Sequence, residues 1–135
     1  MSLREKTARQ SHWPAQLTLV SAQPLTVRLT IPNPGEQVLQ LDEPSVCSRG
    51  ELENAVFHLT ADGVEVPYQG ELRKRAPPDR FIEVTPGESF SVAVDLSTSF
   101  TVPRRGTLVI HYETLNHFSP DEVRLVSNEL VVERR

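Results

Sequence analysis

Hydrophobic and polar residues alternate along most of the chain, as they do in β-strands that bury one face. The alternation is clearest in two segments, in which every second residue is apolar: Leu25, Val27, Leu29 and Ile31, and then Phe90, Val92, Val94 and Leu96. Residues 106–112 repeat the pattern with Leu108, Ile110 and Tyr112. We predict that all three segments are strands whose apolar side chains enter a core.

Turn residues separate these runs from further strands. Asp62-Gly63 lies between two alternating runs and predicts a β-hairpin. Weaker strand patterns occupy residues 17–19 and 39–41, and residues 123–133 predict a terminal strand with a bulge near Ser127-Asn128. Residues 43–54 form a long polar connection, in which we expect one helical turn near the end.

These features predict an all-β fold, an immunoglobulin-like antiparallel β-sandwich of about seven to nine short strands. The sandwich is preferred to a barrel because irregular connections, such as residues 43–54, suit Greek-key crossings. Residues 1–15 are polar and aperiodic, so we expect a flexible N-terminal segment there. Residues 16–135 then form a single β-sandwich domain, which is an ordinary domain size.

Charge and composition limit the possible partners. The chain has 14 Lys and Arg against 18 Asp and Glu, a formal net charge of −4, which argues against general nucleic-acid binding. No apolar run approaches the roughly 18 residues of a membrane helix, so we expect no membrane partner. The N-terminus does not resemble a signal peptide. We therefore expect a cytoplasmic protein, or an exported one whose leader has been removed.

The candidate catalytic and metal-binding residues form no recognised motif. None of the four histidines lies in a His-Glu-x-x-His sequence. His58 and His111 alternate outward from predicted strands and could share a metal if they are neighbours, although such histidines are more often solvated surface. Cys47 cannot form an intrachain disulfide, because it is the only cysteine. A single cysteine can be a small buried apolar residue or a reactive nucleophile, and the sequence does not distinguish the two. We therefore predict a protein that is not an enzyme and has no cofactor or metal.

Basic residues provide the most functional-looking surface. They cluster in an exposed segment and in a later turn: Arg73, Lys74, Arg75 and Arg80, and then Arg104 and Arg105. Arginine favours protein interfaces because its planar guanidinium pairs with two carboxylate oxygens at once. We predict that these residues bind a protein partner, although a solvated loop has the same composition. Exposed strand edges offer a second route, since they can accept an added peptide strand.

Several short motifs, and the order in which they follow along the chain, resemble the non-catalytic N-terminal region of deuterolysin-type (aspzincin, peptidyl-Lys) metallopeptidases. They are Tyr68 with Gly70, Pro86-Gly87-Glu88-Ser89, Val94-Asp95-Leu96-Ser97 and the strand from Gly106 to Tyr112, preceded by the run LTVRLTIPNPGEQVLQL. The resemblance covers roughly residues 17–114. The Pro-Gly-Glu-Ser turn also recurs in other immunoglobulin-like domains, including bacterial intracellular proteinase inhibitors.

The resemblance implies a propeptide-like domain without the catalytic part, because this chain contains no His-Glu-x-x-His motif. It therefore transfers no catalytic or metal-binding residue. The function it implies is a non-enzymatic β-sandwich that inhibits or chaperones a peptidase, with a metallopeptidase or its precursor as the protein partner. The alternative is a structural or assembly module that forms homo-oligomers and has no connection with peptidases. An enzyme that uses Cys47, or a metal at His58 and His111, is a third hypothesis.

Overall fold

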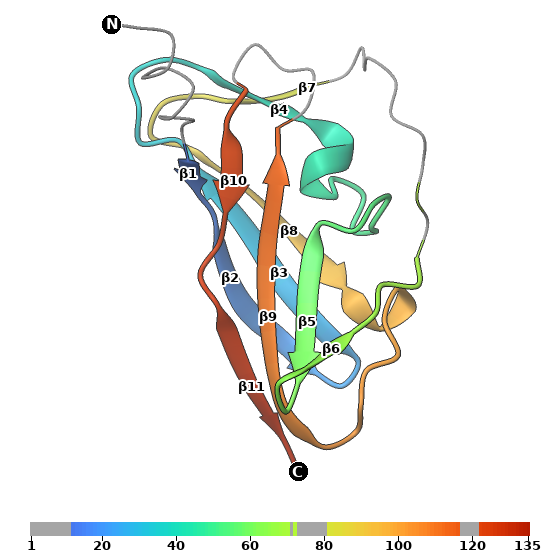
Figure 1. Cartoon of the computed structure of the whole chain (residues 1–135). Helices are drawn as coiled ribbons and strands as arrows, with labels where there is room; N and C mark the ends of the chain where they lie inside the picture. Colours follow the sequence, from blue (N-terminus) through green and yellow to red (C-terminus); the bar gives the residue numbers. More distant parts are fainter. Residues whose placement is uncertain (1–11, 71, 73–80, 117–121) are drawn as a thin grey trace, which may run out of the picture.

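A computed structural model describes residues 12–70, 72, 81–116 and 122–135. In these residues the chain forms eleven β-strands and two short 3-10 helices (Figure 1). The strands are β1 (His12–Pro14), β2 (Gln16–Ala22), β3 (Leu25–Pro32), β4 (Leu39–Asp42), β5 (Phe57–Ala61), β6 (Val64–Val66), β7 (Phe81–Val84), β8 (Ser89–Asp95), β9 (Gly106–Leu115), β10 (Arg124–Val126) and β11 (Leu130–Arg134). The helices are η1 (Glu43–Val46) and η2 (Leu96–Thr98). The predicted all-β, sandwich-like fold is confirmed, and its immunoglobulin-like type stays a prediction.

The larger sheet is built around β9, the longest strand described, with 10 residues. The order is β1-β10-β9-β5-β6, and β11 also pairs with β9. β10 pairs with the C-terminal half of β9 and β11 with its N-terminal half, so one long strand supports two short ones. The interruption between them, at Ser127–Glu129, lies where the sequence predicts a bulge.

The second sheet has the order β2-β3-β8 and is antiparallel throughout. Figure 1 shows it behind the larger sheet, with β4 and β7 forming a separate two-stranded ladder at the upper end. The strongly alternating segments predicted from the sequence become β3, β8 and β9. Most of their inward positions are buried as expected, namely Val27, Leu29, Ile31, Val94, Leu108, Ile110 and Tyr112, whereas Phe90 and Val92 are only partly buried. Full burial of each such side chain favours folding by about 1.5–3 kcal/mol relative to exposure.

The predicted number of strands is too low. The structure has more than seven to nine, because the three-residue β1 has no alternation to reveal it and the last strand is split into β10 and β11. The predicted antiparallel pairing is confirmed for the other strand pairs, and among the described strands only β1 runs parallel to its neighbour, β10. Parallel neighbours cannot be joined by a tight hairpin, and these two strands come from opposite ends of the chain.

The predicted N-terminal boundary and the predicted helical turn also need correction. Residues 12–15 are not a flexible segment: His12–Pro14 is a strand, Ala15 is buried, and the Trp13 indole N–H donates to the Pro32 carbonyl at 2.7 Å. The earlier residues lie outside the described part of the chain. In the connection 43–54 the helical turn, η1, comes at the start rather than near the end, with Pro44 in its first turn. Proline suits that place because its missing N–H would have no helical partner there.

Candidate functional site

The structure describes two of the six predicted partner-binding residues. Arg104 and Arg105 are exposed in the turn that leads into β9. The other four lie outside the described residues: Arg73, Lys74, Arg75 and Arg80. The turn before β9 is therefore the predicted site that can be examined in detail.

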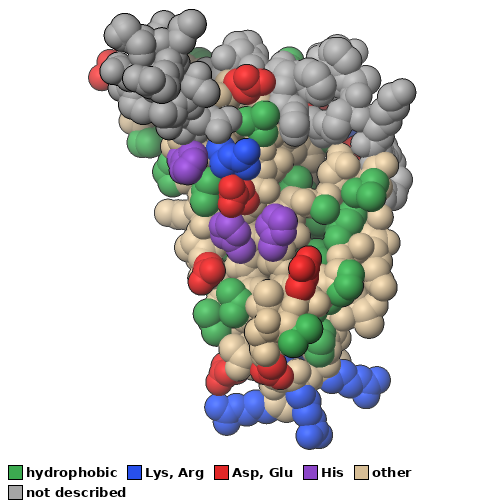
Figure 2. Space-filling view, viewed as in Figure 1, with side chains coloured by type: hydrophobic (Ala, Val, Ile, Leu, Met, Phe, Trp, Pro, Cys, Tyr) green, Lys and Arg blue, Asp and Glu red, His purple; other side chains and the backbone are tan. Residues whose placement is uncertain are grey.

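Strand β11 brings two further arginines to this turn. β11 runs antiparallel to β9, and Arg134 is in register with Gly106. Its Nη1 donates a hydrogen bond to the Pro103 carbonyl at 3.0 Å, and Arg135 follows it, exposed. Figure 2 shows Lys and Arg side chains gathered at the lower end of the molecule, where the C-terminus lies in Figure 1. We call Arg104, Arg105, Arg134 and Arg135 the arginine end.

A network of hydrogen bonds fixes the backbone beneath the arginine end. Asp62, in the β5–β6 turn, donates its backbone N–H to the Thr107 carbonyl at 2.9 Å. Its carboxylate Oδ1 accepts the Thr107 N–H, also at 2.9 Å. The Thr107 hydroxyl then donates to Glu133 Oε1 at 2.6 Å, which connects β9 with β11. Three segments distant in the sequence are thus joined at one place.

Gly106 allows this close approach of the two turns. Its φ is +118°, a conformation that side chains other than glycine rarely adopt. A Cβ atom at this position would lie only 2.6 Å from Asp62 Oδ2. The glycine therefore places the start of β9, and with it Arg104 and Arg105, against the β5–β6 hairpin.

The charge of the arginine end differs in sign from that of the whole chain. Four guanidinium groups are concentrated at one end of a molecule whose formal net charge is −4. Asp62 and Glu133 add two carboxylates among them, and both carboxylates accept hydrogen bonds from Thr107. Screening limits such a charge cluster to partners within about 8 Å at physiological salt. The arginine end is suited to direct contact with carboxylates, which guanidinium groups bind through two parallel hydrogen bonds.

The candidate nucleophile, Cys47, has a structural role, as have two serines on β8 and η2. Cys47 is buried, and burial raises the pKa of its thiol to about 12, with a further contribution from the negative charge of Glu53. The reactive thiolate is therefore scarcely populated at neutral pH. The Ser97 hydroxyl donates to Asp95 Oδ1 at 2.6 Å in the cap of η2, and Ser91 accepts from Arg28 at 3.2 Å on the exposed face of β3 and β8.

Two histidines that the sequence places outward are direct neighbours. His58 on β5 pairs in register with His111 on β9, and their ring centroids are 6.2 Å apart. Histidine side chains are visible on the exposed face of the larger sheet in Figure 2. Among the described residues, no three His, Cys, Asp or Glu side chains converge closely enough to hold a metal ion as they stand.

A shallow hollow lies at the opposite end from the arginines. It has a volume of about 340 Å³ and is lined by Trp13, Asn33, Gly35, Glu36, Gln37, Val38 and Leu39. The Asn33 side chain joins this loop to β7, since its amide donates to the Gln37 carbonyl in the loop and the Val84 carbonyl on β7, and its oxygen accepts the Gly35 N–H. These bonds shape the loop and leave Asn33 no free group for a ligand.

The sequence predicts a binding role for Arg104 and Arg105, which stays a prediction, and the structure places Arg134 and Arg135 beside them. The terminal Arg-Arg pair follows an alternating strand and is visible in the sequence, but its place beside Arg104 and Arg105 depends on the pairing of β11 with β9.

No helix in the described part of the chain is long and apolar enough to span a membrane. In comparisons with known proteins, no protein-family model matches the chain and no curated protein is significantly similar to it.

Proposed function

We propose that this chain is a non-enzymatic β-sandwich that binds an acidic segment of another protein through its arginine end. The observation that carries the proposal is the convergence of four arginines from two regions of the chain on one hydrogen-bonded turn. A fixed turn loses little conformational freedom on binding, which favours affinity. Arginine is also enriched among the residues that dominate the energy of protein interfaces.

The acidic partner is favoured over nucleic acid by the local charges. Asp62 and Glu133 lie among the four arginines and would repel a continuous phosphate backbone. A protein surface can instead place separate carboxylates against separate guanidinium groups. The negative net charge of the whole chain favours the same choice.

A narrower form of this proposal names a zinc metallopeptidase or its precursor as the partner. It rests on the sequence resemblance to aspzincin N-terminal regions alone. Inhibition in that case would be steric, with the turn 101–106 lying in an extended substrate cleft. Arg104 and Arg105 are exposed in this turn and would be accessible to such a cleft.

The experiment compares tagged wild-type protein with two charge-matched variants as bait in lysate and medium from the source cells. The test variant is Arg104→Gln with Arg105→Gln, and the control is Arg28→Gln with Arg49→Gln, which removes two exposed arginines elsewhere. We expect a protein retained by the wild type and the control but lost from the test variant. With that protein purified, binding should weaken by at least about tenfold in the test variant, which corresponds to about 1.4 kcal/mol.

Equal retention by both variants would overturn the role of the arginine end. If the captured protein is a metallopeptidase, titration with the domain should abolish its activity in proportion to binding. An unaffected peptidase activity at saturating domain would reject inhibition while leaving the binding proposal intact.

A second candidate function, self-association as an assembly module, is favoured by strand β2. β2 is at the edge of its sheet, carries no charged side chain, and exposes Leu19 and Val20. Exposed edge strands without charges readily pair with other strands. A concentration-dependent dimer in sedimentation measurements, with no captured partner, would favour this function instead.

A further inference from the structure

The outer face of the larger sheet carries a pair of facing imidazoles. His58 and His111 are directly opposite in the antiparallel ladder between β5 and β9. Their neighbours Phe57, Leu59, Ile110 and Tyr112 are all buried, so both histidines must point away from the core. The ring centroids are 6.2 Å apart and the ring planes are inclined by 32°. Side chains directly opposite in such a ladder are close enough to act on one ligand.

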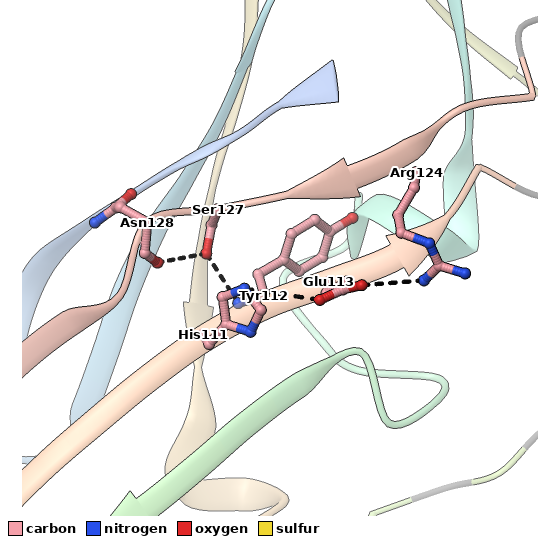
Figure 3. A network of polar contacts seen from close by, with 6 residues as sticks. All are labelled: His111, Tyr112, Glu113, Arg124, Ser127 and Asn128. Atoms are coloured by element: carbon pink, nitrogen blue, oxygen red, sulfur yellow. Dashed lines mark hydrogen bonds and ion pairs between the residues drawn. The ribbon is translucent and has the colours of Figure 1, made fainter. Parts of the chain in front are cut away.

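A carboxylate stands next to this pair on the same face. Glu113 follows His111 by two residues on β9, and its Oε1 is 3.9 Å from His111 Nε2. Its other oxygen, Oε2, is 3.2 Å from Nη1 of Arg124 on β10. Figure 3 shows Glu113 between His111 and Arg124, with one oxygen toward each. Arg124 therefore orients the carboxylate and leaves Oε1 facing the histidine.

We propose that His58 and His111 form a binding site for a divalent late transition-metal ion of the zinc class, with Glu113 as the third ligand. Two imidazole nitrogens and one carboxylate oxygen form a donor set that Zn²⁺ accepts, with water in the remaining position. Imidazole selects zinc, nickel and copper over calcium and magnesium, which prefer oxygen ligands. The Arg124 contact to Glu113 is the kind of outer contact that holds a ligand in orientation.

The three side chains must rotate to close around an ion, because they do not converge closely enough as they stand. Nitrogens that share one zinc ion lie within about 4 Å of each other, since each is about 2.0–2.1 Å from the metal. The ring nitrogens lie at the edges of the two imidazoles. Rotation of either side chain can therefore make the distance between a His58 nitrogen and a His111 nitrogen shorter than the distance between the ring centroids. The His111 and Glu113 side chains are 27% and 35% exposed, which leaves them room to turn without disturbing the core.

His12 provides a matched control on the same face. It is exposed on β1 and is in register with Arg124, so it lies across β10 from β9 rather than beside His111. Removing it changes the number of histidines without touching the proposed ligands. It also separates a specific site from general binding of zinc to surface imidazoles.

The experiment titrates the full chain with ZnCl₂ by calorimetry and follows the imidazole signals by NMR. We expect saturable one-to-one binding, with shifts confined to the rings of two histidines, His58 and His111. His58→Gln and His111→Gln should each weaken binding by about tenfold or more, and His12→Gln should leave it unchanged. Glu113→Gln should weaken it less than loss of either histidine, because both imidazoles remain.

Three results would overturn the site. The first is the absence of saturable zinc binding. The second is full zinc affinity in both His58→Gln and His111→Gln. The third is a loss of zinc affinity in His12→Gln as large as in those two variants. Full affinity in Glu113→Gln would remove the carboxylate from the ligand set. The NMR experiment uses the wild-type protein, so the proposal stays testable if a variant fails to fold. This site is independent of the arginine end, so either can fail without the other.

Discussion

Alkaline pH should destabilise this protein through its buried cysteine. The Cys47 side chain is buried at the end of η1, and the residue has a positive φ of 54°. Burial penalises the charged thiolate, and the negative charge of Glu53 adds to this effect, so the pKa rises from 9.0 to about 12. The unfolded chain has no such environment and keeps the ordinary value.

The sign and size of the effect follow from these two values. Between pH 9 and about 12 the unfolded thiol loses its proton while the folded thiol keeps it, so the unfolded state is favoured as the pH rises. The stabilisation is complete below pH 9 and is lost as the pH approaches 12. At pH 10 the unfolded thiol is about one pH unit above its pKa, and the free energy of unfolding should fall by about 1.4 kcal/mol. The whole difference between 9.0 and about 12 corresponds to about 4 kcal/mol.

Urea denaturation of the wild type and of Cys47→Ala at pH 8 and pH 10 measures this contribution. Alanine keeps the Cβ atom and removes the ionisable group, so the difference in pH dependence between the two proteins isolates Cys47. Burial raises the pKa of the Tyr112 hydroxyl well above 10.0, with smaller contributions from Cys47 and Asp42, so Tyr112 adds alkaline destabilisation to both proteins and the Cys47 contribution is the difference that remains. Identical pH dependence in the two proteins would refute the reasoning. So would fast reaction of the native thiol with a disulfide reagent at pH 8, because a buried, protonated thiol should react only on unfolding.

Two substitutions test contacts that hold the sandwich together. Tyr112→Phe removes the hydroxyl that donates to the Ser45 carbonyl at 2.6 Å. The free energy of unfolding, measured in urea at pH 7, should fall by about 1–2 kcal/mol. An unchanged urea midpoint would contradict this role of the hydroxyl. Gly106→Ala should cost about 1–3 kcal/mol because of its positive φ and the clash with Asp62. Gly63→Ala should cost less, since no described atom lies within 4 Å of its Cβ position, and equal falls in Tm would show that the clash is unimportant.

The sequence predicts the strands of this fold better than their pairing. Alternation is a local property, so residues 25–31 and 106–112 reveal both the strand and its buried face. The sequence His-Trp-Pro of β1 is too short to alternate, and its place beside β10 depends on residues more than a hundred positions away. Alternation is also incomplete in β2, where Leu17 is buried but Leu19, two residues later, is exposed at the sheet edge next to an irregularity in the pairing.

The same limit applies to the candidate sites. Arg104 and Arg105 are adjacent in the sequence, so their cluster is visible there, whereas Arg134 joins them only through the register of β11 with β9. The outward direction of His58 and His111 follows from their apolar neighbours, but that they face each other follows from the β5–β9 register alone. Local chemistry can therefore be read from the sequence, and sites that span two strands require the pairing.

The two faces of β9 have different roles: its inward side chains stabilise the fold, and its outward side chains are available for binding. Inward, Tyr112 packs against Phe57 with ring centroids 5.2 Å apart and bonds to η1 through its hydroxyl. Outward, its neighbours His111 and Glu113 form the proposed metal site. Because successive side chains of a strand point to opposite faces, changes at His111 or Glu113 should leave the urea midpoint of the zinc-free protein nearly unchanged. If such variants lost zinc binding and zinc-free stability together, the imidazole pair would be a structural contact of the sheet rather than a site for a ligand.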